Sequence, residues 1–325
     1  MRVLFVGLST AGHTYPMVPL ARAVRAAGHE VHVAVGEGVH PELRAAGLRP
    51  FRPADAFYGI YAEDLAPELE RLRPDLVVHG WGVPEAAVAA RRAGIASLWH
   101  GFGRMFAERI GLDSPVRVAP NVPHVDICPP SLQDPDFLSA VERVALRPVP
   151  WSPPGPIPRT GGRVVYVTLG TAFGTAELLT GVLRALSTVD VRVVVATGRV
   201  DPAELSAVPP NATVRAWVPQ AAFLPHVDVV VHHGGSGTTL GALAAGVPQV
   251  LLPQGADQFG NADAVHAAGA GVRVADPAEV ADTVAHLLRP DAAEREAARA
   301  LAAEIAAMPS PEEVAGRLPE YAARP

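Results

Sequence analysis

A glycine-rich turn between an apolar strand and an apolar helix is the feature of this sequence with the clearest chemical meaning. We expect the strand at 227–231, the turn at 232–237 and the helix at 238–245. The first backbone N–H groups of a helix have no intrahelical acceptor, and the helix macrodipole adds positive partial charge at that end. Turn glycines let phosphate oxygens approach the main chain, and hydroxyls add donors. The turn therefore predicts a nucleotide diphosphate site formed by Gly234, Gly235, Ser236, Gly237, Thr238 and Thr239.

The residues that flank this turn supply the other contacts that a nucleotide sugar needs. Trp217 begins a Trp-Val-Pro-Gln segment upstream, and Asp257 and Gln258 follow a predicted strand at 249–252. An indole can stack on a base, and a carboxylate beside an amide can hydrogen-bond sugar hydroxyls. Glycines alone are equally typical of a tight turn in an ordinary α/β domain, so these flanking residues favour the ligand site.

The segment 217–261 resembles the donor-binding signature of family 1 glycosyltransferases, in particular the actinobacterial branch that glycosylates macrolides and aromatic polyketides. The resemblance covers most of the chain and is densest in the C-terminal half. It implies a GT-B fold, a nucleotide sugar as co-substrate and a small-molecule acceptor. Base, ribose, diphosphate and sugar contacts would come from Trp217, Val218, Gln220, Thr171, His233, Gly234, Gly235, Ser236, Gly237, Thr238, Asp257 and Gln258.

One departure from the family bears on the nucleotide. Plant members carry a glutamate in the helix that binds the ribose hydroxyls, and Gly241 stands at that position here. A missing carboxylate is compatible with 2′-deoxyribose, so dTDP is favoured over UDP.

His13 is the candidate catalytic base. It lies in the loop after a predicted first strand, and an imidazole can take a proton from a hydroxyl near neutral pH. An ordinary loop histidine is the alternative, and the resemblance favours the catalytic role. Relatives orient this histidine with an aspartate, but Gly80 occupies the matching position, and neither Glu85 nor Asp55 is a compelling substitute.

The N-terminal half is short for an acceptor-binding domain, with about 145 residues before the Pro-rich segment 147–162. Aromatic side chains are the expected lining of a hydrophobic acceptor pocket, although such residues more often belong to the core. We predict acceptor contacts from Trp81, Phe57 and Phe102.

No metal is expected to be required. His232 and His233 are adjacent at the end of a strand, so their side chains point to opposite sides and do not share one ion. Asp134 and Asp136 match the Asp-x-Asp metal motif superficially, but a proline-rich turn precedes them. We interpret this pair as a helix cap.

Composition limits the remaining classes of function. The 325 residues suffice for two domains, and the net charge of −6 disfavours a nucleic-acid binder. No apolar run approaches the ~20 residues of a membrane helix. The single Cys128 fits a reducing cytoplasm. A homodimer is compatible with the sequence, which leaves the oligomeric state open.

Apolar strands alternate with amphipathic helices in both halves, a pattern typical of parallel sheets covered on both faces. We therefore predict an α/β protein of GT-B fold, with two Rossmann-like, doubly wound parallel-sheet domains facing a cleft. The expected organisation is an acceptor-binding domain at 1–146, a Pro-rich linker at 147–162, a nucleotide-sugar-binding domain at 163–308, and a C-terminal helix at 309–325 that crosses back to the first domain.

Together, these expectations predict an inverting glycosyltransferase. It would move a hexose or deoxyhexose from an NDP-sugar, with dTDP favoured over UDP, to a specialised metabolite by single displacement. Two alternatives stay open: a nucleotide-sugar 2-epimerase of the same fold, and a non-catalytic helper of a glycosyltransferase. A NAD-dependent enzyme is disfavoured because the first turn, 7–12, lacks the Gly-x-Gly-x-x-Gly pattern.

Overall fold

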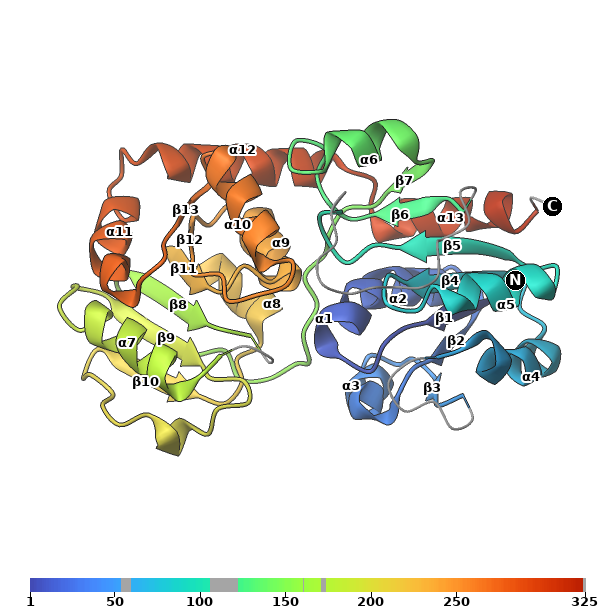
Figure 1. Ribbon diagram of the computed structural model, residues 1–325, viewed down its shortest axis with the longest axis horizontal. Coiled ribbons are helices and arrows are strands. Elements are labelled where there is room, and N and C mark those ends of the chain that lie inside the picture. Colours follow the sequence, from blue (N-terminus) through green and yellow to red (C-terminus); the bar gives the residue numbers. More distant parts are fainter. Residues whose placement is uncertain (54–59, 106–121, 160, 171–173, 324–325) are drawn as a thin grey trace. The chain divides into compact units, whose positions relative to one another are not determined.

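The protein is a two-unit α/β molecule. The computed structural model describes residues 1–53, 60–105, 122–159, 161–170 and 174–323. Unit 1 comprises Met1–Pro153 and Ala307–Pro325, and unit 2 comprises Pro154–Ala306 (Figure 1). The chain leaves unit 1 inside the Pro-rich segment 147–162. Each unit carries one parallel sheet, which confirms the predicted fold class.

The described part of unit 1 has a seven-stranded sheet in the order β3-β2-β1-β4-β5-β6-β7, and every pairing is parallel. Its strands are β1 (Arg2–Val6), β2 (Glu30–Ala34), β3 (Pro50–Phe51), β4 (Leu76–Gly80), β5 (Ala96–His100), β6 (His124–Asp126) and β7 (Arg143–Ala145). Its helices are α1 (Ala11–Thr14), α2 (Val18–Ala26), α3 (His40–Ala45), α4 (Ala62–Leu72), α5 (Glu85–Arg92), α6 (Pro135–Ala140) and α13 (Pro311–Ala322).

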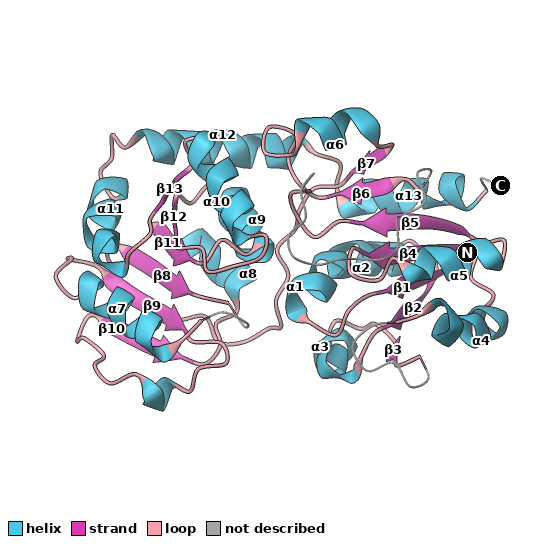
Figure 2. Ribbon diagram, in the orientation of Figure 1, coloured by secondary structure: helices cyan, strands magenta, loops and turns pink. Residues whose placement is uncertain are grey.

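The described part of unit 2 has a six-stranded parallel sheet in the order β10-β9-β8-β11-β12-β13. Its strands are β8 (Val164–Thr168), β9 (Arg192–Ala196), β10 (Ala212–Arg215), β11 (Val229–His232), β12 (Gln249–Leu251) and β13 (Gly271–Arg273). Its helices are α7 (Ala176–Leu186), α8 (Gln220–Phe223), α9 (Ser236–Ala244), α10 (Gln258–Ala267), α11 (Val280–Leu287) and α12 (Ala293–Ala307), which ends one residue beyond the unit boundary. In both units most strands are followed by a helix (Figure 2).

The central strands are apolar on both faces, which explains why their sequences show no alternation. All residues of β4 and β8 are buried, so helices must cover each sheet on both sides. In unit 1, Leu4, Val6 and Val77 pack with apolar residues of α4 and α5. The last helix, α13, packs on α2 and on β5 of the same unit, so the chain end completes unit 1.

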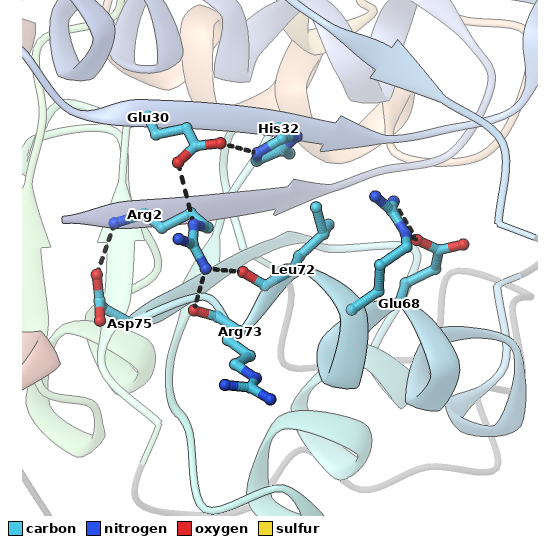
Figure 3. A network of polar contacts seen from close by, with 8 residues as sticks. Arg2, Glu30, His32, Glu68, Leu72, Arg73 and Asp75 are labelled. Carbon is cyan, nitrogen blue, oxygen red and sulfur yellow. Dashed lines mark hydrogen bonds and ion pairs between the residues drawn. The ribbon is translucent and has the colours of Figure 1, made fainter.

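Polar contacts join the amino-terminal ends of β1 and β2 to the end of α4 (Figure 3). The Arg2 guanidinium bonds Glu30 Oε2 on β2 at 3.0 Å and the carbonyl oxygens of Leu72 and Arg73 at the end of α4. Its backbone N–H donates to Asp75 Oδ2 at 2.6 Å. A cation beside the last carbonyl groups of a helix is favourable, so these contacts stabilise the fold of unit 1.

The structure also corrects some predicted boundaries. The short strands β3, β6, β7, β10 and β13 were not predicted, because each contains a proline or a charged residue that interrupts the apolar pattern. Helix α9 begins at Ser236 and not at Thr238, since Gly235 adopts the extended conformation of an N-cap. Asp134 caps α6 as predicted, accepting the N–H groups of Asp136 and Phe137. Among the described helices, none has the length and apolar character needed to cross a membrane.

Candidate active site

The predicted diphosphate turn connects β11 to α9, and Gly234 fixes its shape. This residue has φ of 89°, in the left-handed region that favours glycine. A Cβ at this position would lie 2.8 Å from the carbonyl oxygen of Gln258, so the approach of the turn to α10 also requires glycine.

His232 holds the turn from inside the protein. Its Nδ1 accepts the Gly234 N–H at 3.1 Å, and its Nε2 donates to Gln249 Oε1 at 2.7 Å. Burial lowers the pKa of His232 to about 3, so the ring is neutral at physiological pH. This residue is therefore structural, a role that the sequence did not reveal.

The His233 ring is nearly perpendicular to that of His232, with an interplanar angle of 88° and ring centroids 6.2 Å apart. It occupies space that Gly170 and Gly235 leave open, because a Cβ on either glycine would collide with the imidazole. Burial lowers its pKa, and the nearby Asp257 carboxylate partly opposes this effect. No group of three metal-ligating side chains that could hold an ion exists among the described residues.

The first turn of α9 presents backbone donors. Thr238 and Thr239 donate their N–H groups to the Gly235 carbonyl. In the described chain, the preceding N–H groups of Ser236 and Gly237 have no acceptor. Gly237 is exposed, and a Cβ there would meet nothing within 4 Å. Helix N-terminal donors with open space above them form an anion site.

A hydrogen-bond network joins this turn to the start of α10. Asp257 Oδ2 accepts from Ser236 Oγ and from Asn261 Nδ2, both at 2.9 Å. Asn261 Nδ2 also lies 2.9 Å from the Gly234 carbonyl. Asn261 was not predicted as a site residue, yet it is buried and lies within hydrogen-bond distance of Gly234, Ser236 and Asp257. Its place one helical turn after Asp257 is the signal that could have identified it.

Gln258 and Val218 have structural contacts that their predicted ligand roles did not include. Gln258 is buried, and its Oε1 accepts the N–H groups of Gln254 and Gly255 at 2.8 and 3.2 Å. Val218 is also buried, in the apolar cluster that contains Phe223, so its side chain belongs to the core.

Trp217, next to Val218, is the most exposed tryptophan, with 45% of its surface accessible. An exposed indole of this kind can stack on a nucleotide base. Gln220 opens α8, and its Oε1 accepts from Thr238 Oγ1 at 3.3 Å, which links the Trp217 segment to α9. Thr171 lies outside the described residues.

In unit 1, the structure brings the predicted base together with two predicted acceptor residues. His13 lies in α1, and its ring centroid is 5.2 Å from that of Phe102 and 6.3 Å from that of Trp81. The Trp81 and Phe102 rings are 5.3 Å apart. His13 Nδ1 lies 2.8 Å from Thr10 Oγ1. Phe57, the third predicted acceptor residue, lies outside the described residues.

The position expected for an orienting aspartate is the last residue of β4, Gly80. A Cβ there would be 3.6 Å from Met17 and from the Val6 carbonyl, which is ordinary van der Waals contact. Glu85 opens α5, and Asp55 lies outside the described residues. On the His13 ring, Nδ1 contacts the hydroxyl of Thr10.

Similarity to known proteins extends over nearly the whole chain. Residues 180–321 match the family model of the erythromycin biosynthesis protein CIII-like C-terminal domain. The elloramycin glycosyltransferase ElmGT of Streptomyces olivaceus is 35% identical over 379 residues, covering 98% of this chain and 97% of the relative. The chain belongs to the family 1 glycosyltransferases. It is an enzyme of the actinobacterial, natural-product branch, as the sequence predicted.

Solved structures agree with this assignment to the family 1 glycosyltransferases. The glycosyltransferase SnogD of Streptomyces nogalater has a TM-score of 0.82 with 27% identity, covering 99% of each chain. The spinosyn rhamnosyltransferase SpnG is 29% identical and covers 98% of this chain and 99% of its own. Its complexes with thymidine diphosphate and with spinosyn aglycone have TM-scores of 0.81 and 0.80. The GT-B fold of this glycosyltransferase follows from these similarities.

Proposed function

We propose that this glycosyltransferase transfers a hexose or deoxyhexose from a dTDP-sugar to a small hydrophobic natural product, with inversion at the anomeric carbon. Support for the nucleotide comes from the thymidine diphosphate bound by the relative SpnG. Gly241, buried in α9, has no side chain that could bind a ribose 2′-hydroxyl. Both observations favour dTDP over UDP.

The observation that carries the proposal is the open N-terminus of α9. The N–H groups of Ser236 and Gly237 would donate to the diphosphate, and the macrodipole would stabilise its negative charge as it leaves. Trp217 would stack on the base, Gln220 would lie near the ribose, and Asp257 and Gln258 would contact sugar hydroxyls. Charge stabilisation of this kind requires no metal ion.

Unit 1 would bind the acceptor and activate its hydroxyl. His13 takes the proton from the acceptor hydroxyl through Nε2, and the oxygen attacks the anomeric carbon as the bond to the diphosphate breaks. Trp81 and Phe102, whose rings flank His13, would hold an apolar acceptor beside the base. We propose residues 1–146 as the acceptor-binding part and 163–308 as the donor-binding part.

The acceptor-binding part is proposed to be shorter than in relatives. The alignment with ElmGT extends over 379 residues, which exceeds the 325 residues of this chain. The relative therefore has segments that this chain lacks. A shorter N-terminal half, as the sequence indicates, would leave a shallower acceptor pocket.

Turnover of donor sugars with a panel of aglycones tests the proposal. The purified enzyme is incubated with dTDP-, UDP- and GDP-hexoses, together with the spinosyn aglycone and other polyketide alcohols and phenols. We expect transfer from a dTDP-sugar, an inverted anomeric configuration in the product by NMR, and a loss of about 100-fold or more in His13→Gln. Retained configuration, or full activity in His13→Gln, would contradict the mechanism.

The same assay separates the two alternatives. An epimerase would convert UDP-N-acetylhexosamine without an acceptor. A non-catalytic helper would leave every donor unchanged while still binding a partner glycosyltransferase.

A further inference from the structure

Thr10 occupies the position where a threonine side chain ordinarily caps a helix, yet its hydroxyl contacts the His13 ring. Its backbone is extended, with φ of −123° and ψ of 144°, and its carbonyl accepts the Thr14 N–H at 3.0 Å. In the described chain the side chain accepts no N–H from the first turn of α1. Thr10 Oγ1 lies 2.8 Å from His13 Nδ1 instead. A capping hydroxyl stabilises a helix, so its use on the ring requires another explanation.

The loop that carries Thr10 is fixed on both sides. Thr14 is buried, and its hydroxyl donates to the Leu8 carbonyl. Ser9 packs directly on Gly36, where an added Cβ would collide with the serine side chain. The Thr10 hydroxyl therefore holds its place without help from a ligand, which is the condition for orienting another side chain.

We propose that Thr10 is a positioning residue for His13. Its oxygen accepts the Nδ1–H hydrogen bond, which holds the imidazole in the tautomer whose Nε2 lone pair can take the acceptor proton. This inference rests on the base role proposed for His13. In a Ser-His-Asp triad a carboxylate fixes the tautomer and also compensates the imidazolium charge. A hydroxyl supplies only the first of these effects, and Gly80 cannot supply the second.

The histidine tautomer can be read directly in the full-length enzyme without any ligand. Long-range ¹H–¹⁵N NMR spectra of ¹⁵N-labelled protein are recorded above the imidazole titration, and His13 is assigned by its absence from His13→Gln. We expect the Nδ1–H tautomer in the wild type and in Thr10→Ser. In the isosteric Thr10→Val we expect a shift toward the Nε2–H tautomer, which predominates for the neutral histidine side chain in water.

The kcat and KM of the same variants are then measured with the dTDP-sugar and aglycone that the wild type turns over. Thr10→Val should lower kcat by about tenfold with little change in KM, and Thr10→Ser should restore it. Thr175→Val is the matched control, because Thr175 caps α7 by accepting the Leu178 N–H at 3.2 Å. That control should lower the melting temperature while the His13 signals and kcat stay unchanged.

An Nε2–H tautomer in the wild type would overturn the inference, as would a Thr10→Val variant with the wild-type spectrum or the wild-type kcat. The base role is tested separately by His13→Gln. Full activity in that variant would refute the proposed mechanism and the Thr10 inference together. A normal loss in His13→Gln with an unaffected Thr10→Val would refute only the positioning role.

Discussion

At the scale of single residues, two glycines of the α9 turn are explained by different constraints. Gly234 is required by the fold, because its φ is positive and a Cβ would collide with the backbone of α10. Gly237 is required by neither conformation nor packing, since its surroundings are open. A glycine that the fold does not need, at a helix N-terminus, indicates close approach by a ligand.

Gly237→Ala should therefore separate stability from binding. Alanine is a better helix former than glycine, so the melting temperature should stay equal or rise. The added methyl group would occupy the space of the diphosphate, and the Kd for dTDP should increase about tenfold or more. Thermal unfolding and calorimetric titration measure the two effects.

Gly316→Ala in α13 is the matched control, because a Cβ at Gly316 also meets nothing within 4 Å. It should raise the melting temperature and leave dTDP affinity unchanged. Equal dTDP affinity in Gly237→Ala and the wild type would show that the diphosphate does not approach this turn.

At the scale of elements, Asn261 connects the start of α10 to the turn before α9. Its amide group lies within hydrogen-bond distance of the Gly234 carbonyl, Ser236 Oγ and Asp257 Oδ2, at 2.9 to 3.0 Å. Replacement by leucine would leave buried acceptors without a donor. We expect Asn261→Leu to lower the free energy of unfolding by about 2 kcal/mol.

Urea denaturation gives the stability of Asn261→Leu, and dTDP titration reports on the turn. Ser236→Ala removes one member of the network and should cost less than Asn261→Leu. A leucine variant as stable as the wild type would show that the network does not hold the two helices together.

Three neighbouring strands of unit 1, β4, β5 and β6, each carry a buried histidine. His79 on β4 pairs in register with Trp99 on β5, which pairs with His124 on β6, and His100 follows Trp99. Burial lowers the pKa of His79 and of His100 to about 4, and that of His124 to about 3. The folded protein therefore keeps these rings neutral well below the ordinary pKa of 6.5.

Stability should consequently fall as the pH decreases from about 6.5 to about 4, because only the unfolded chain takes up protons in that window. Each such histidine contributes a slope of up to about 1.4 kcal/mol per pH unit. Above pH 6.5 both states are neutral at these positions, and the contribution is constant.

Urea unfolding of the wild type and of His79→Phe across this pH range measures how steeply the free energy of unfolding changes with pH. The variant should show a shallower loss of stability, because one proton fewer binds on unfolding. A slope unchanged by the substitution would mean that His79 titrates in the folded protein.

At the scale of the whole molecule, the sequence predicted the two parallel sheets because β1, β2, β4, β5, β8, β9, β11 and β12 lie in apolar runs that alternate with amphipathic helices. Strands β3, β6, β7, β10 and β13 escaped prediction because they are short and each contains a proline or a charged residue. His13, Trp81 and Phe102 were predicted separately, and the structure brings them together. The contacts of Asn261 and Thr10 depend on side-chain directions across a turn, which spacing does not determine.

The end of the chain belongs to unit 1, and its packing predicts where a C-terminal substitution acts. Leu318 of α13 is fully buried, together with Val314 and Ala315. Leu318→Ala should lower the stability of unit 1 by about 2–5 kcal/mol through lost burial and a residual cavity. Hydrogen exchange should show faster opening in β1, β4 and β5 than in unit 2. Equal opening in both units would contradict this assignment of α13.

Calorimetric titration of dTDP, UDP and GDP into the full-length protein tests the central claim most directly, namely that the α9 turn binds a nucleotide diphosphate. We predict saturable binding of dTDP at one site per chain, weaker binding of UDP and none of GDP. Trp217→Ala should weaken the dTDP interaction by about 1–3 kcal/mol, because the base loses its stacking partner. Absence of binding by all three nucleotides would contradict the account of the donor site.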